Sequence, residues 1–309
     1  MNETYIFGHQ NPDTDATLSS ICYGKYLESK WMNIKVIKLW ELNNETKYLL
    51  NLLDIEEPPT VTNLAEWSDI VLTDHNDKSQ SIADREKYNI LQVIDHHNFG
   101  NFSTGKPAFI RAEPLCSSCS VIYKIFVENN YSIDQKTASM LIAAILSDSL
   151  FWKSPTSTDE DKEIVNKLNQ IAEIKDLEKF AMDMFAAKSD LGDISIEEII
   201  KSDYKMFEVN GTKFGVGVLE TTNPAYSLDK KEAIAEELNN IRTKSWLDFI
   251  MFSVVDIIQE VNTTISGSDE DKKIISEAFW VDFEWCTADL GNVLSRKKQV
   301  IPVLNKYFG

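Results

Sequence analysis

The sequence predicts an α/β protein of two domains, with a parallel sheet flanked by helices in the first and a smaller α/β domain with a mixed sheet in the second. Short apolar runs alternate with segments of helical periodicity, which is the pattern of α/β folds. The chain of 309 residues also exceeds the usual size of one hydrophobic core. Aspartate and histidine follow three of the apolar runs, at the sheet edge where open α/β folds bind ligands. We therefore expect an active site at these strand ends, in the cleft between the two domains.

Four apolar runs predict a parallel sheet in the first domain that is covered on both faces. The expected strands are residues 4–8, 34–39, 70–74 and 90–95. Apolar residues at helical spacing predict helices near residues 15–29, 118–129, 134–147, 159–172 and 175–188. Two consecutive prolines, Pro58 and Pro59, mark a turn before the third strand.

A polar segment near residue 190 interrupts the helical periodicity and predicts the boundary between the domains. Behind it, Ser195 and Glu198 have the spacing of a capping box at a helix start. We expect domains at residues 1–188 and 195–309, joined by a linker at residues 189–194. In the second domain, strands are expected near 205–209, 213–220, 248–256 and 261–266, and helices near 229–242 and 269–279.

The composition excludes several classes of partner. A net charge of −18 argues against binding of DNA or RNA, because affinity for nucleic acid comes largely from lysine and arginine that neutralise phosphates. A small phosphate ester is still compatible, provided that metal ions and a few local cations neutralise it. No apolar stretch reaches the roughly 18 residues of a membrane span, and the first residues lack the features of a signal peptide. We expect a cytoplasmic protein that binds no membrane.

The chain has four cysteines, and two of them form a Cys-x-x-Cys pattern, Cys116 and Cys119. A structural zinc site needs two more ligands at matching spacing, and neither Cys22 nor Cys286 has a neighbour of that kind. We interpret the pair as small buried residues at the start of a helix, in keeping with a reducing compartment. Zinc binding or redox chemistry is the alternative.

All four histidines lie in the first 97 residues, and each belongs to a motif that contains aspartate. The motifs are His9 with Asp13 and Asp15, then Asp74-His75-Asn76, then Asp95-His96-His97. Histidine is the commonest metal ligand among side chains. Helix capping, a turn or a core contact explains any one of these residues alone, but the recurrence after three expected strands predicts a metal site.

The spacing within the motifs suggests how the side chains divide their roles. Asp13 and Asp15 are separated by one residue, so in a turn they can diverge and hold two cations side by side. His96 and His97 are consecutive, and in extended backbone they point to opposite faces, so that one binds metal while the other faces substrate. Asp148 ends an apolar helix, where a carboxylate is costly unless it is paired or metal-bound.

Nitrogen and carboxylate ligands without sulfur favour Mn²⁺ or Co²⁺ over structural zinc. With about seven such ligands the site has enough donors for two ions, which together activate water and clamp an in-line displacement at phosphorus. Asp74 follows the middle one of the three motif strands in sequence, so it is a candidate for a ligand that bridges the ions.

Near the end of the chain, three consecutive cations, Arg296, Lys297 and Lys298, are unusual in so acidic a protein. A guanidinium matches phosphate oxygens bidentately, and an ammonium supplies a point charge. The alternative is a solvated basic loop, which describes most charge runs. The sequence around Lys205 indicates only a surface lysine.

These motifs carry a family resemblance over essentially the whole chain. The sequence resembles the family II, manganese-dependent inorganic pyrophosphatases of the DHH phosphoesterase superfamily. The resemblance rests on the opening segment 6–15, the two later Asp-His motifs, Arg111-Ala112-Glu113-Pro114, and the segments 147–150, 153–156 and 295–299. Segment 295–299 is the most specific, because it distinguishes pyrophosphatases from other DHH proteins.

The resemblance implies an activity and a set of site residues. The implied activity is hydrolysis of inorganic pyrophosphate to two phosphates by a hydroxide that bridges two Mn²⁺ (or Co²⁺) ions per subunit, while Mg²⁺ arrives with the substrate. The implied ligands of one metal are His9, Asp13 and Asp74, and those of the second are Asp15, Asp74, His96 and Asp148. The residues implied to contact the phosphates are His97, Lys205, Arg296 and Lys297, with His97 also assisting the leaving group. A homodimer formed through the first domain is implied as well.

Two positions depart from the family pattern. Asn98 stands where the family usually has arginine, and Leu115-Cys116 stands where it usually has Val-Gly. Both concern the surroundings of the ligands and not the ligand set.

A DHH phosphodiesterase or short-RNA nuclease is one alternative function, but we find no glycine-rich substrate motif in the second domain. A short-chain exopolyphosphatase is a closer alternative. A non-catalytic metal- or phosphate-binding regulator is the alternative from another class, and the complete ligand set argues against it.

Overall fold

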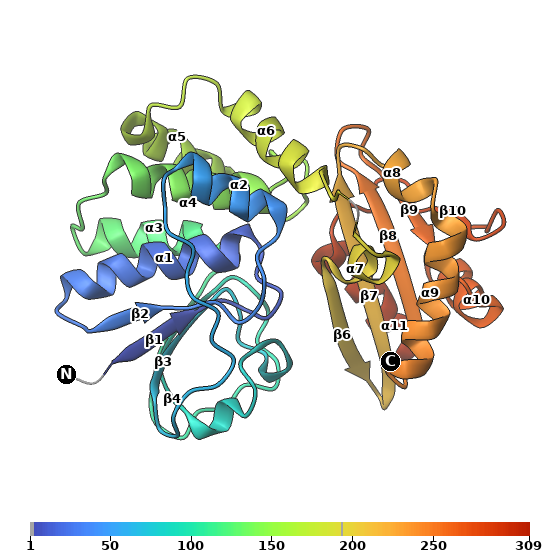
Figure 1. Cartoon of the computed structure of the whole chain (residues 1–309), viewed down its shortest axis with the longest axis horizontal. Coiled ribbons are helices and arrows are strands. Elements are labelled where there is room, and N and C mark those ends of the chain that lie inside the picture. Colours follow the sequence, from blue (N-terminus) through green and yellow to red (C-terminus); the bar gives the residue numbers. More distant parts are fainter. Residues whose placement is uncertain (1–2, 193) are drawn as a thin grey trace. The chain divides into compact units, whose positions relative to one another are not determined.

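The computed structural model describes residues 3–192 and 194–309. The chain folds into two compact units. The first unit consists of Met1–Trp152 and Thr156–Met184, and the second of Lys153–Pro155 and Phe185–Gly309. Each unit has its own β-sheet and its own helices (Figure 1). The two-domain α/β architecture expected from the sequence is therefore confirmed.

The first unit contains a five-stranded sheet in which every pair of neighbours is parallel. The strands are β1 (Thr4–Phe7), β2 (Ile34–Val36), β3 (Asp69–Thr73), β4 (Asn89–Asp95) and β5 (Phe109–Ala112). Their order in the sheet is β2-β1-β3-β4-β5. The three strands followed by Asp-His motifs, β1, β3 and β4, are therefore adjacent, and β3 is the middle one. Because the strands are parallel, all three motifs leave the sheet at the same edge.

Helices cover one face of this sheet (Figure 1). They are α1 (Thr14–Ser29), α2 (Asn44–Leu52), α3 (Ser118–Glu128), α4 (Gln135–Asp148), α5 (Asp159–Ala172) and α6 (Leu177–Ser189), the last of which extends past the first unit. Loops and the 3₁₀ turns η1 (Lys78–Gln80) and η2 (Arg85–Lys87) follow β3 on the way to β4. Loop residues such as Ile82 and Phe102 pack with the strand residues Phe7 and Leu72 in one apolar cluster. Both faces are covered, as expected, but the second is covered by loops.

The helices that lead away from the site begin at polar caps. The carboxylate of Asp13 accepts from the backbone N–H of Ala16 at the start of α1, and Ser117 caps α3. Such caps satisfy backbone donors that have no partner inside the helix. In this unit, the helix α2 and the strand β5 were not expected from the sequence. Helix α2 is only nine residues long, and β5 is an edge strand with exposed side chains, so neither has a clear apolar pattern.

The second unit is built on a mixed sheet of five strands in the order β10-β9-β8-β7-β6, with only β7 and β8 parallel. The strands are β6 (Tyr204–Val209), β7 (Thr212–Thr221), β8 (Phe249–Asp256), β9 (Val261–Ile265) and β10 (Thr287–Asp289). The helices are α7 (Ile196–Lys201), α8 (Ala225–Leu228), α9 (Lys231–Lys244), α10 (Asp269–Phe279) and α11 (Ile301–Phe308). The expected capping box is present at α7, where Ser195 and Glu198 bond each other's backbone N–H. A π-helical turn, η3 (Arg296–Val300), precedes α11.

The four cysteines are free and buried. Burial raises the pKa of the Cys116 and Cys119 thiols well above their ordinary value, which makes them poor nucleophiles and poor metal ligands. Among the described residues, no group of side chains suited to a metal includes a cysteine. In the same part of the chain, no helix is long and apolar enough to cross a bilayer.

Candidate metal centre

The end of β1 is packed directly against the start of α1. A Cβ atom on Gly8 would lie 2.4 Å from the backbone oxygen of Ala16, so no other residue fits at that position without a shift of the backbone. This close approach brings His9, just after the strand, beside Asp13 at the helix cap.

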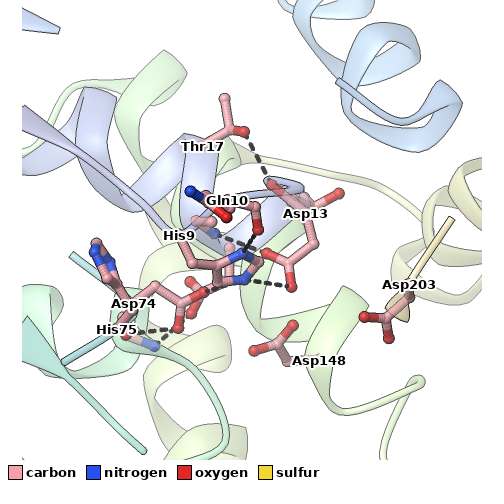
Figure 2. A network of polar contacts seen from close by, with 12 residues as sticks. His9, Gln10, Asp13, Thr17, Asp74, His75, Asp148 and Asp203 are labelled. Carbon is pink, nitrogen blue, oxygen red and sulfur yellow. Dashed lines mark hydrogen bonds and ion pairs between the residues drawn. The ribbon is translucent and has the colours of Figure 1, made fainter. Parts of the chain in front are cut away.

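His9 faces two carboxylates (Figure 2). Its Nε2 atom lies 3.3 Å from Oδ2 of Asp13 and 3.4 Å from Oδ2 of Asp74. Its Nδ1 atom donates to the backbone oxygen of Gln10 at 2.6 Å. Because a carbonyl oxygen can only accept, the proton is on Nδ1, and Nε2 faces the carboxylates. A metal-ligating histidine is usually held by the same kind of bond from its other nitrogen.

His96 repeats this arrangement at the end of β4. Its Nε2 atom lies 3.1 Å from Oδ1 of Asp74, 3.7 Å from Oδ2 of Asp148 and 4.0 Å from Oδ2 of Asp15. Its Nδ1 atom donates to the backbone oxygen of Leu115 at 3.0 Å. The two histidines therefore approach Asp74 through different oxygens, Oδ2 for His9 and Oδ1 for His96.

The backbone of Asp74 explains this central position. Asp74 is the first residue after β3 and has a positive φ of 58°, in the left-handed region. Its N–H still bonds the oxygen of Ile94 on β4, so the residue is held against the neighbouring strand. The chain thus turns at Asp74 with the carboxylate between the ends of β1 and β4, and Ser118 donates to its Oδ1 at 3.1 Å.

Asp15 is buried and is held by the start of α3. It accepts from the hydroxyl of Ser117 at 2.7 Å, and from the backbone N–H groups of Ser118 and Cys119 at 2.7 and 3.1 Å. Burial and the nearby Asp74 carboxylate nevertheless raise the pKa of Asp15 to about 7. Neighbouring buried carboxylates such as those of Asp15 and Asp74 are costly unless a cation lies between them.

The donor atoms therefore fit a metal centre. Three groups have ligand atoms within 4.8 Å of one another: His9 with Asp13 and Asp74, Asp15 with His96 and Asp148, and Asp74 with His96 and His97. As expected for cations side by side, Asp13 and Asp15 diverge into different groups. All donors are imidazole nitrogen or carboxylate oxygen, a set that suits Mn²⁺.

The two consecutive histidines are not arranged as expected. We predicted opposite faces, but their ring centroids are 4.3 Å apart and both rings face Asp74. The backbone is not extended here, because Oδ1 of Asp95 accepts the N–H groups of both His96 and His97, at 2.7 and 3.0 Å. The prediction of opposite faces is wrong for this reason.

Asp95 also orients the ring of His97. Nδ1 of His97 lies 2.9 Å from Oδ1 of Asp95 and 3.6 Å from Oδ1 of Asp74. The amide of Asn76 donates to the other oxygen of Asp95 at 2.7 Å. Burial alone would raise the pKa of Asp95, but His97, together with hydrogen bonds from His97 and Asn76, lowers it below its ordinary value. We did not single out this supporting aspartate from the sequence, although it directly precedes the double histidine.

His75 is the one histidine that does not face the carboxylates. Its Nδ1 donates to the backbone oxygen of Thr73 at 2.9 Å, and its Nε2 accepts from Ser81 at 3.0 Å. Burial lowers the pKa of His75 to about 3, so the ring is neutral. Both nitrogens are used in hydrogen bonds within the loop, and His75 has a structural role.

Comparison with known proteins identifies the family. Profiles described as "DHH family, N-terminal domain" and "DHHA2 domain" match residues 3–145 and 182–307. A probable manganese-dependent inorganic pyrophosphatase of Deinococcus radiodurans is 38% identical, and a manganese-dependent inorganic pyrophosphatase of Bacillus subtilis is 35% identical, each alignment covering 98% of both chains. A solved structure from Methanococcus jannaschii, described as a putative family II inorganic pyrophosphatase, is 34% identical with a TM-score of 0.89 and covers 99% of both chains. The chain belongs to the family II inorganic pyrophosphatases.

The two departures from the pyrophosphatase pattern occur where the backbone makes the contact. Leu115 holds His96 through its carbonyl oxygen, and Cys116 donates its N–H to the carboxylate of Asp161 at 3.1 Å. The carbonyl oxygen of Asn98 accepts from Asn76 at 3.0 Å. These three contacts use backbone groups and therefore do not depend on the side chains at the substituted positions.

The cationic residues singled out from the sequence lie in the second unit. Arg296 begins the π-helical turn, and its guanidinium donates to the backbone oxygen of Asp203 at 2.9 Å and to its Oδ1 at 2.7 Å. Its side chain is only 12% exposed, so it is not a solvated loop residue. Lys297 follows it in the turn, and Lys205 is on β6, two residues after Asp203. The fold thus places Arg296 beside the start of β6, which spacing in the sequence does not reveal.

Proposed function

We propose that this chain hydrolyses inorganic pyrophosphate to two phosphates and that the reaction depends on manganese. Membership of the family, and the relatives named as manganese-dependent inorganic pyrophosphatases, support the substrate and the metal. The observation that carries the proposal is the position of Asp74, with one carboxylate oxygen facing His9 and the other facing His96. That arrangement suits a ligand shared by two ions.

We propose two Mn²⁺ (or Co²⁺) ions in each subunit, with Mg²⁺ bound to the incoming substrate. The first ion is assigned to His9, Asp13 and Asp74, and the second to Asp15, Asp74, His96 and Asp148. A pair of such ions polarises phosphoryl oxygens and lowers the pKa of water. The chain contributes the orientation of the donors, because each histidine is fixed through Nδ1 and Asp15 through the start of α3.

We assign His97 to the substrate. The Asp95 carboxylate accepts from Nδ1, so Nε2 is the nitrogen left to face substrate, and in the protonated ring Nε2 carries the proton that it donates to a phosphate oxygen or to the leaving group. A positioned acid or base of this kind contributes about 10²–10⁴-fold to the rate. His97 also belongs to a group that can hold a metal. Unlike His9 and His96, however, the nitrogen that it turns toward Asp74 is Nδ1, the same atom that is bonded to Asp95, and this difference favours the substrate role.

We further propose that Lys205, Arg296 and Lys297 neutralise the charge of the phosphates. The Asp203 carboxylate holds one side of the Arg296 guanidinium in place, which reduces the conformational freedom lost when phosphate binds. Arg296→Ala is therefore expected to lower kcat/KM by about 10²–10³-fold without weakening Mn²⁺ binding. Lys298→Ala is the matched control, since that lysine bonds the backbone oxygen of Pro155, and it should stay near the parent activity.

A phosphate-release assay tests the function. The chelator-treated chain, supplied with Mn²⁺ and Mg²⁺, is offered pyrophosphate, tripolyphosphate or a dinucleotide. We expect rapid release from pyrophosphate only, and none with Asp74→Asn. Preferential cleavage of tripolyphosphate or of the dinucleotide would instead indicate an exopolyphosphatase or a phosphodiesterase. Full activity with Mg²⁺ alone would contradict the assigned metal.

The domain limits 1–188, 189–194 and 195–309, the homodimer and the cytoplasmic location remain predictions from the sequence and the family resemblance. Sedimentation of the purified chain tests the dimer.

A further inference from the structure

Glu45 is a fully buried carboxylate outside the proposed ligand set. It lies in the first turn of α2, the short helix that was not expected from the sequence, and none of its surface is exposed. A buried carboxylate is costly unless it is hydrogen-bonded or paired, so its presence calls for a specific contact.

Its Oε2 atom joins two segments that carry proposed metal ligands. Thr14, between Asp13 and Asp15, donates its hydroxyl to Oε2 at 3.0 Å. Ser147, directly before Asp148, donates its hydroxyl to the same atom at 2.9 Å. The two donors are far apart in sequence, and both side chains are buried.

We infer that Glu45 is a positioning residue that sets the separation between the aspartates at the start of α1 and Asp148 at the end of α4. Through Thr14 and Ser147 it ties both segments to one point, and the ligands Asp15 and Asp148 approach His96 from those segments. The inference rests on the proposed metal centre. Residues that orient metal ligands typically contribute about 10–100-fold to metal affinity.

Calorimetric titration of the chelator-treated full chain with Mn²⁺ tests this role, at a temperature where circular dichroism shows every variant folded. Glu45→Ala should weaken Mn²⁺ affinity by about 10–100-fold. Glu45→Gln keeps an oxygen that can accept from both Thr14 and Ser147, so it should stay within about 3-fold of the parent. Asp271→Ala, which removes a buried carboxylate in the second unit, should lower Tm and leave Mn²⁺ affinity unchanged.

The outcomes separate this inference from the proposed function. A parent chain that fails to bind Mn²⁺ would overturn both. A parent that binds, together with parent-like affinity in Glu45→Ala, would overturn the positioning role alone. If Glu45→Ala does not fold, Ser147→Ala removes one of the two donors and should weaken binding by about 3-fold or more; unchanged affinity there would also overturn it.

A different observation concerns five tryptophans on the surface. Trp31, Trp67, Trp246, Trp280 and Trp285 are 70–90% exposed and have φ between 53° and 66°. Exposed rings gain little from packing, and left-handed backbone is unfavourable for a bulky side chain. Each position therefore combines strain with an unburied apolar surface.

Three of these tryptophans end helices in the way that glycine normally does. After α1, Trp31 N–H bonds the oxygen of Glu28 at 2.9 Å, and Met32 N–H bonds that of Leu27 at 3.2 Å. This pair of bonds is a Schellman motif, and its left-handed residue is most often glycine. Trp246 after α9 and Trp280 after α10 occupy the corresponding positions.

We infer that these five positions are glycine positions of the fold and that the chain made in its own organism carries glycine there. One codon that different translation systems read as tryptophan or as glycine would account for all five positions together. Glycine adopts φ > 0 without a steric penalty, and its small size suits exposed turns.

Two measurements test this inference. Replacing all five tryptophans by glycine should raise Tm by about 10 °C in total, at about 2 °C per site, whereas replacing them by alanine, which keeps the Cβ atom, should not. Mass spectrometry of peptides from the chain isolated from its source should show glycine masses at these positions. A glycine variant no more stable than the alanine variant would overturn the inference that the fold favours glycine at these positions. Tryptophan in the natural peptides would overturn the inference that the natural chain carries glycine there.

Discussion

The ends of β3 and β4 carry the same dipeptide, Asp-His, and use it in opposite ways. At the end of β3, the carboxylate of Asp74 faces the candidate metal centre, and His75 is buried in hydrogen bonds to its own loop. At the end of β4, His96 faces the candidate metal centre, and Asp95 supports the two histidines that follow it. The roles of aspartate and histidine are exchanged between neighbouring strands.

The backbone explains the exchange. Asp74 has left-handed φ directly after its strand, which turns its side chain toward the ends of β1 and β4. Asp95 is still part of β4, and its carboxylate accepts the next two backbone N–H groups, which curls the chain and presents the imidazoles. A motif identifies the chemistry available at a strand end, but the local conformation decides which member of the pair binds.

The largest expected effect comes from removing the aspartate that faces the centre. Asp74→Ala should abolish Mn²⁺ binding and lower turnover by about 10⁴-fold or more, because both proposed ions lose a ligand. Calorimetry and phosphate release measure the two effects. Retained Mn²⁺ affinity in this variant would contradict the proposed role of Asp74 as a ligand of both ions.

The two histidines after β4 should separate metal binding from turnover. His97→Gln is expected to keep Mn²⁺ and lose turnover by about 10²–10⁴-fold, since it loses a proton donor or a substrate contact. His96→Gln is the matched comparison and should weaken Mn²⁺ binding. Equal loss of metal in both variants would show that His97 is a ligand, as its place in the third group of donors allows.

The supporting aspartate should have a smaller effect than the ligand aspartate. Asp95→Asn keeps the shape of the side chain but weakens the charge-assisted bond to His97, so turnover should fall by about 10–100-fold with Mn²⁺ affinity nearly intact. Steady-state kinetics on the Mn²⁺-loaded variant measure this effect. A loss as large as that of Asp74→Ala would mean that the two aspartates are not exchanged in role.

Substitution of His75 is expected to have the smallest effect on activity and to lower the stability of the fold instead. His75→Asn should leave turnover near the parent value and lower the free energy of unfolding by about 1–3 kcal/mol, because buried hydrogen bonds are lost. Loss of Mn²⁺ binding in this variant would contradict its structural role.

The pH dependence of stability gives a second test of the structural role of His75. The folded pKa of His75 is lowered to about 3, below the ordinary value of about 6.5 for the unfolded chain. Between these values the unfolded chain binds more protons, so the stabilising contribution of neutral His75 is complete above about pH 6.5 and decreases as the pH falls, by up to about 1.4 kcal/mol per unit. As the pH falls over that range, the stability advantage of the metal-free parent over His75→Asn should shrink and then reverse, because the loss of up to about 1.4 kcal/mol per unit exceeds the advantage of about 1–3 kcal/mol before pH 3 is reached. A constant difference would show that His75 does not titrate as assigned.

The sequence predicts the elements that carry strong periodicity and the three strand ends that carry the motifs. It does not predict β5, whose side chains are exposed, or the short helix α2 that supplies Glu45. It identifies Asp95 and His75 as members of motifs but not their roles, because these depend on single backbone torsions and on contacts across the fold. The position of Arg296 beside Asp203 depends on a contact between residues 93 positions apart, which spacing alone does not give.

Anomalous diffraction at the manganese edge, from crystals of the Mn²⁺-loaded chain, tests the exchange of roles most directly. We expect peaks on both sides of the Asp74 carboxylate, one coordinated by Nε2 of His9 and the other by Nε2 of His96. Neither His75 nor Asp95 should lie within bonding distance of a peak. Manganese bound to His75 or to Asp95, or no peak at Asp74, would contradict the account.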